Sequence, residues 1–104
     1  MYMIIWEYQV KADRLTELEK IYHSNGVWAE LFRKAPGYIG TELLRDETNP
    51  NRIITIDRWE SAESYEAFHS QFKKEYETLD VQCKELTEHE ILLGKWETVN
   101  YETR

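Results

Sequence analysis

The sequence predicts an α+β domain of the ferredoxin-like type, with four strands in one antiparallel sheet and two helical regions on one face of it. Three observations lead to this prediction. Some segments alternate apolar and polar residues as strands do, others repeat apolar residues at helical spacing, and the two kinds follow in the order β-α-β-β-α-β. With 104 residues, we expect a single domain over 1–104, with a core over 3–99 and a polar tail over 100–104 that frays.

Four segments predict the strands. In the first, apolar residues occupy every second position, while Glu7 and Gln9 lie between them. Segments 38–46 and 52–59 predict the second and third strands, and the polar turn over 47–51 joins them as a hairpin. Segment 90–99 predicts the fourth strand. The alternating residues of the first strand are Ile4, Trp6, Tyr8 and Val10.

Two segments predict helical regions. The first covers 13–34, where Asn25-Gly26 should break the helix and Pro36-Gly37 should end it. The second begins after Ser61, a suitable N-cap, and continues through a bend towards Leu86. Its apolar stripe consists of Tyr65, Phe68, Phe72, Tyr76 and Leu79.

The sheet face away from the helices is expected to be covered. The third strand places Ile53, Thr55, Asp57 and Trp59 on one side and Ile54, Ile56 and Arg58 on the other, so neither side is purely polar. A second copy of the chain is the simplest cover, and we expect a homodimer through the sheet faces. Asp57 or Arg58 is then expected to face the partner sheet in an ion pair, or Glu7 and Asp57 to form a carboxylate pair there.

Composition excludes several classes of partner. The net charge is −7 without a basic cluster, which argues against nucleic acid and anionic membrane surfaces. No apolar run is long enough to span a membrane, and segment 1–10 lacks the features of a signal peptide. Cys83 is the only cysteine, so no intrachain disulfide forms, and the three histidines match no metal-site spacing. We therefore expect a soluble, cytoplasmic protein without a metal.

Three segments carry a family resemblance: MIIWEYQV, APGYIGTELLRD and IITIDRWESAESYEAFHSQF. Together they resemble the antibiotic biosynthesis monooxygenase (ABM) family over roughly residues 3–96. The resemblance implies a dimeric α+β barrel with a cavity between sheet and helices in each subunit. Some members of the family oxidise aromatic molecules with dioxygen without metal or flavin, so no cofactor is expected. The haem-degrading branch does not fit, because Glu7, Phe68 and Leu79 stand where it carries asparagine, tryptophan and histidine.

Six residues are candidates for the site. His69 matches the family's helical histidine and is the candidate catalytic residue, because an imidazole exchanges a proton near neutral pH. The candidate substrate-binding residues are Trp59, Tyr65, Trp28, Tyr22 and His23. Each also has a structural interpretation, as core packing for the aromatic residues or as a helix-surface histidine.

Two functions remain open. One is a cofactor-independent monooxygenase, an oxidoreductase, that acts on a small hydrophobic or aromatic molecule in the cavity. The other is a non-catalytic homodimer that binds a small molecule or serves as a stress-related protein. An inward-facing His69 or other titratable group in a closed apolar cavity of about 300 Å³ or more would favour the enzyme.

Overall fold

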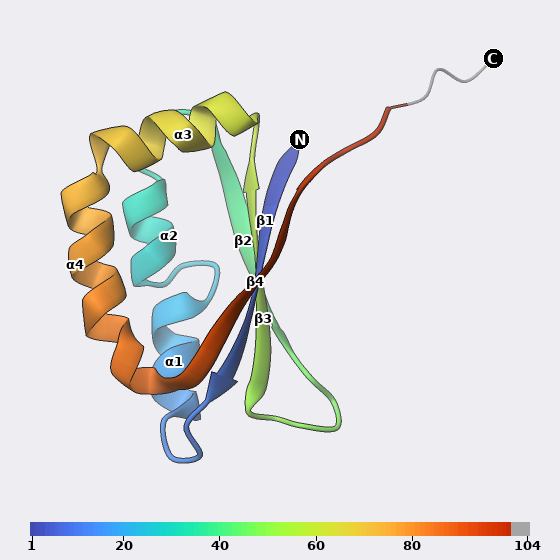
Figure 1. Ribbon diagram of the computed structural model, residues 1–104, viewed down its shortest axis with the longest axis vertical. Helices are drawn as coiled ribbons and strands as arrows, with labels where there is room; N and C mark the ends of the chain where they lie inside the picture. The colour runs from blue at the N-terminus through green and yellow to red at the C-terminus, as the bar shows by residue number, and fades with distance from the viewer. Residues whose placement is uncertain (101–104) are drawn as a thin grey trace.

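The computed structural model describes residues 1–100 and confirms the ferredoxin-like α+β fold (Figure 1). The sheet has the strand order β2-β3-β1-β4, with every neighbouring pair antiparallel. β4 begins at Thr87 rather than at residue 90. The tail predicted over 100–104 lies, apart from Asn100, outside the described residues. The strands are β1 (Tyr2–Val10), β2 (Tyr38–Arg45), β3 (Arg52–Trp59) and β4 (Thr87–Glu97).

The first helical region breaks where the sequence predicts. α1 (Leu15–Tyr22) and α2 (Val27–Phe32) meet at Gly26. A β-carbon on Gly26 would lie 2.3 Å from the carbonyl oxygen of Ile21, so only glycine fits this junction. The break allows α2 to turn independently of α1 and to lay its own apolar face on the sheet.

The second helical region begins as predicted but is divided earlier. The Ser61 hydroxyl accepts a hydrogen bond of 3.1 Å from the backbone N–H of Ser64, which confirms the N-cap of α3 (Ala62–Gln71). α4 (Lys73–Cys83) follows after Phe72, and a 3₁₀ turn, η1 (Lys84–Leu86), leads into β4. The change of direction at Phe72 carries α4 down beside α1 and α2 (Figure 1).

The core lies between the sheet and the helices, which all cover the same face (Figure 1). Trp59 is fully buried at its centre, and its ring lies 5.6 Å from that of Phe32 and 5.2 Å from that of Phe68. The largest fully buried side chains are Trp59, Phe68, Leu18, Ile53, Leu86 and Val10. An aromatic core of this kind holds α2 and α3 against β3.

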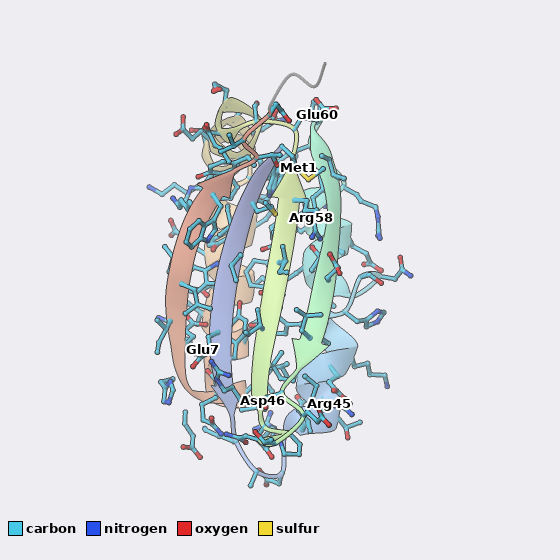
Figure 2. All side chains as sticks on the ribbon, turned by 90° about the vertical axis from the view of Figure 1, so that its right-hand side faces the viewer. Met1, Glu7, Arg45, Asp46, Arg58 and Glu60 are labelled. Atoms are coloured by element: carbon cyan, nitrogen blue, oxygen red, sulfur yellow. The ribbon has the colours of Figure 1, made fainter. Side chains whose placement is uncertain are left out.

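The opposite face of the sheet carries no helix and is partly apolar (Figure 2). Arg52 joins Glu7, at 2.6 Å, to Asp46, at 3.2 Å, and Arg58 pairs with Glu42 on this face. Strand alternation places the following apolar side chains here: Met3, Ile5, Leu44, Ile54, Ile56, Ile91 and Trp96.

Asp57 lies on the helix side, whereas Glu7 lies on the open side. The expected pairing of Glu7 with Asp57 is therefore wrong, because residue 57 pairs with Ile4 and shares the face of the buried even-numbered residues of β1. Arg58 is the member of the Asp57-Arg58 pair that faces outward (Figure 2).

No helix within residues 1–100 combines the length and the apolar character that crossing a lipid bilayer requires.

Candidate functional site

A cavity of about 100 Å³ lies between the helix side of the sheet and helices α1, α2 and α4. All four strands and these three helices contribute side chains to it. The lining residues are Trp6, Tyr8, Tyr22, Trp28, Phe32, Thr41, Thr55, Asp57, Tyr76, Asp80 and Glu90. Six of them are aromatic and three are acidic, and none is a lysine, arginine or histidine.

Asp57 is the charged side chain at the buried end of the cavity. Its side chain is only 9% exposed, and its Oδ1 accepts a hydrogen bond of 2.8 Å from the Thr41 hydroxyl. The Thr41 hydroxyl lies 2.7 Å from the Tyr38 hydroxyl. Because Thr41 already gives its proton to Asp57, Tyr38 donates to Thr41. This chain of hydroxyls fixes the Asp57 carboxylate and leaves Oδ2 without a donor among the described residues.

The charge of Asp57 is not neutralised. No lysine, arginine or histidine within residues 1–100 forms an ion pair with it. Burial raises the pKa of Asp57 from 3.8 to about 6, and the hydrogen bond from Thr41 offsets part of that rise. A carboxylate with such a pKa is largely ionised at pH 7 and can take up a proton there, as a general base must.

The walls are aromatic rings in mutual contact. The Trp28 ring lies 5.1 Å from that of Tyr76 and 6.1 Å from that of Tyr22, and Tyr22 lies 5.1 Å from Tyr8. Burial raises the pKa of Tyr8, Tyr22 and Tyr76, so these phenols stay protonated at neutral pH. The walls can therefore stack on a ring and donate hydrogen bonds, but they do not act as bases.

The exposed end of the cavity is acidic. Asp80 on α4 is partly exposed, and Glu90 on β4 is exposed. Partial burial raises the pKa of Glu90, and the nearby Asp80 adds to the effect while Lys84 opposes it. The two carboxylates thus lie close enough to repel each other at the mouth.

The structure brings only two of the sequence-predicted site residues to the cavity, Tyr22 and Trp28. Trp59 belongs to the core, and Tyr65 packs beside it with ring centroids 5.6 Å apart. His23 closes the turn after α1, where its Nδ1 accepts a hydrogen bond of 3.1 Å from the backbone N–H of Asn25.

His69 does not line the cavity. Its ring packs on the aromatic residues of its own helical region, 5.9 Å from the Tyr65 ring and 4.8 Å from the Tyr76 ring. Position 69 follows Phe68, which points into the core, so the helix turns His69 towards the flank. Tyr76 is the side chain that separates His69 from the cavity.

Sequence reasoning missed Thr41 and Thr55 as site residues, and it considered Asp57 only as part of a carboxylate pair with Glu7. One signal for two of them was present: Thr55 and Asp57 alternate with Ile53 and Trp59, so they had to share a buried face with apolar neighbours. Buried polar side chains on a core face need either partners or a ligand. Asp80 and Glu90 could not be found in this way, because the position of Asp80 depends on the path of α4 and that of Glu90 on the register of β4 with β1.

Within residues 1–100, no three histidine, cysteine or acidic side chains come together as a group able to hold a metal ion. Cys83 is buried, and burial raises the pKa of its thiol.

Comparison with known families gives one match, to the model described as antibiotic biosynthesis monooxygenase, over residues 1–73. The chain belongs to the antibiotic biosynthesis monooxygenase family. No curated protein sequence matches it significantly. The part matched to the antibiotic biosynthesis monooxygenase model contains Trp28, Thr41 and Asp57, whereas Asp80 and Glu90 at the mouth of the cavity lie beyond it.

Solved structures share the fold of this antibiotic biosynthesis monooxygenase family member at low sequence identity. SnoaB, described as a cofactor-independent oxygenase from Streptomyces nogalater, is 16% identical, with a TM-score of 0.75 over 96% of this chain and 94% of that one. A candidate antibiotic biosynthesis monooxygenase from Deinococcus radiodurans is 14% identical, with a TM-score of 0.71 over 100% and 98%. A protein from Mycobacterium tuberculosis is 11% identical, with a TM-score of 0.70 over 98% of both chains.

Proposed function

We propose that this protein is a cofactor-independent monooxygenase that acts on an electron-rich, single-ring quinol or phenol. One observation carries the proposal: Asp57 is a buried carboxylate without a counter-ion, and it lines a cavity whose walls are aromatic. Unpaired buried charges are costly and concentrate at functional sites. Membership of the antibiotic biosynthesis monooxygenase family and the fold shared with SnoaB support the same reaction class.

The size of the cavity limits the substrate. At about 100 Å³ it is smaller than the ~300 Å³ typical of the smallest ligand pockets. An apolar cavity of about 150 Å³ takes up a benzene ring. A single ring that enters with small side-chain adjustments therefore fits better than a fused polycyclic molecule.

The chemistry requires only a base, a dry pocket and an oxidisable ring. Asp57 Oδ2 accepts the proton of a ring hydroxyl, and the resulting anion transfers an electron to dioxygen. For a quinol the balance is one quinol plus one dioxygen giving one hydroxyquinone and one water. One oxygen atom enters the ring, the other leaves as water, and the ring supplies the four electrons.

Thr41 and Tyr38 have a positioning role in this scheme. Thr41 holds Oδ1, so Oδ2 points to the substrate in one orientation. When Asp57 takes up the proton on Oδ2, Oδ1 remains an acceptor, so the hydrogen bonds from Thr41 to Asp57 and from Tyr38 to Thr41 persist through the step.

Oxygen uptake tests the proposal. With a panel of small quinols, catechols and naphthols, wild-type protein is expected to consume dioxygen, and Asp57→Asn is expected to be slower by roughly 10²–10⁴-fold, the usual contribution of a general base. His69→Ala is expected to retain most of the activity, because Tyr76 separates His69 from the cavity. Loss of activity in His69→Ala with full activity in Asp57→Asn would make His69 the base instead.

A second function is favoured by the small volume of the cavity: non-catalytic binding of a small molecule. The same panel separates the two functions. Saturable quenching of tryptophan fluorescence without oxygen uptake in the wild type would identify a binding protein, since Trp6 and Trp28 line the cavity.

We also propose that the protein is a homodimer in which the open sheet faces pack on each other. Leu44, Ile91 and Trp96 on this face are 43%, 47% and 52% exposed, and Ile54 and Ile56 lie between them. A contiguous apolar surface on a sheet of this kind is typical of an interface.

Light scattering at micromolar concentration is expected to give twice the chain mass of 12.6 kDa. Ile56→Asp places a charge at the middle of this face and is expected to give 12.6 kDa. Val81→Asp, at an exposed position of α4 on the other side of the molecule, is the matched control and should remain dimeric. A wild-type mass of one chain would contradict the dimer.

A further inference from the structure

We propose that the cavity selects a ring that carries a protonated amine, so that the substrate is a cationic catechol or quinol rather than a neutral or anionic one. This inference rests on the proposed function and names the substrate class of the same site. It comes from the charge on the lining side chains and from where those charges lie.

All three charged groups that line the cavity are carboxylates: Asp57, Asp80 and Glu90. Asp57 is nine-tenths buried and has no counter-ion among residues 1–100, so the interior itself lacks positive charge. None of the lysines, arginines or histidines of residues 1–100 lines the cavity. Lys84 acts on Glu90 from an exposed position, and Lys95 lies 5.5 Å above the Tyr65 ring.

The carboxylates lie at two ends of the cavity. Asp57 pairs with Ile4 of β1 across the sheet, whereas Glu90 pairs with Tyr8, further along the same strand. Asp57 is buried, and Glu90 with Asp80 marks the exposed end. An elongated ligand can therefore place a ring hydroxyl at Asp57 and a cationic substituent between Asp80 and Glu90.

The mouth favours a cation for two reasons. Asp80 on α4 and Glu90 on β4 repel each other, and an ammonium group between them removes that repulsion. Trp6, Trp28 and Tyr76 line the same cavity, and the face of an aromatic ring attracts a cation. An anionic substituent meets two like charges here, which costs affinity and excludes the wrong ligand.

Three catechols of similar size and different charge test the inference: dopamine is cationic, hydroxytyrosol is neutral and dihydroxyphenylacetate is anionic. Binding is measured by calorimetry under argon, so that no oxidation takes place. We expect dopamine to bind about tenfold more tightly than hydroxytyrosol, as two partly exposed ion pairs of up to about 1 kcal/mol each allow. Dihydroxyphenylacetate is expected to bind most weakly.

A second experiment removes the charges of Asp80 and Glu90 at the exposed end of the cavity. In the double variant Asp80→Asn with Glu90→Gln, the preference for dopamine over hydroxytyrosol is expected to fall to about twofold or less. Glu77→Gln with Glu88→Gln is the matched control, because both glutamates are exposed on the same two elements and neither lines the cavity. The control should keep the wild-type preference.

Each outcome separates this inference from the proposed function. Equal affinities for dopamine and hydroxytyrosol, or a preference unchanged in the double variant, overturn the inference even when oxygen uptake is observed. A dopamine preference that the double variant loses, without oxygen uptake for any catechol, supports the charge selection and overturns the monooxygenase. Failure of all three catechols to bind overturns this inference, whereas the proposed function falls only when the wider panel of quinols and phenols gives no oxygen uptake.

Discussion

Asp57→Asn is expected to raise the free energy of unfolding at pH 7 by up to about 3 kcal/mol. Burial raises the pKa of Asp57 from 3.8 to about 6, and each pH unit of such a shift corresponds to about 1.4 kcal/mol. Asparagine has nearly the same shape, carries no charge and can still accept the hydrogen bond from Thr41. The gain is large beside a total stability of about 5–15 kcal/mol for a domain.

The sign of the pH dependence follows from the direction of the pKa shift. Between 3.8 and about 6 the folded protein binds more protons at Asp57 than the unfolded chain does. The contribution of Asp57 to stability is therefore fully present below 3.8 and is lost as pH rises to about 6. Urea unfolding at several pH values is expected to show the variant well above the wild type at pH 7, with the difference shrinking towards zero at pH 4.

Asp13→Asn is the control for this prediction, because Asp13 is exposed. It should leave the free energy of unfolding within about 0.5 kcal/mol of the wild type. A stability of Asp57→Asn equal to or below that of the wild type at pH 7 would show that the charge of Asp57 carries no cost in the folded protein. The basis for Asp57 as a poised base would then be lost.

Trp59→Ala is expected to destabilise the protein by about 3–5 kcal/mol, the usual cost of removing a buried tryptophan. The side chain is fully buried, and its ring lies 5.3 Å from Tyr38 and 5.2 Å from Phe68. The loss combines the transfer of a large apolar group with the cavity left behind. Urea or thermal unfolding measures it directly.

Val81→Ala provides the comparison, because Val81 is 65% exposed on α4 and should change stability by less than about 0.5 kcal/mol. Trp59→Phe separates the core role from the ligand-binding role predicted from the sequence. A variant that keeps its stability but loses binding of catechols would show that Trp59 is a ligand contact. Retained binding is expected, because the cavity does not reach Trp59.

Strand alternation, the Ser61 cap and the break at Gly26 were readable from the sequence because each depends on neighbouring residues. The division between α3 and α4 at Phe72 could not be predicted from the sequence, because the apolar stripe continues with unchanged spacing from Phe68 to Tyr76. The direction of α4 beyond Phe72 is set by packing on α2, where Tyr76 meets Trp28.

The choice of the catalytic base also depends on contacts between residues far apart in the sequence. Alternation placed Asp57 on the face of Ile53 and Trp59, but only the register of β3 with β1 shows that this face is the buried one. His69 was selected for the chemistry of its imidazole. Its distance from the cavity depends on Tyr76, a residue seven positions away whose orientation no local pattern determines.

The division of the helical layer into short segments has a further consequence. Trp28 and Phe32 are carried by α2, which spans only Val27–Phe32, and Tyr76 and Asp80 are carried by α4 beyond Phe72. The two segments join the rest of the helical layer at Gly26 and at Phe72, whereas β3, which carries Asp57, is paired with a strand on each side. Asp57 is therefore held by strand pairing on both sides, whereas the aromatic walls opposite it are held by side-chain packing. A ligand larger than the cavity is therefore expected to displace the aromatic side chains before it displaces Asp57.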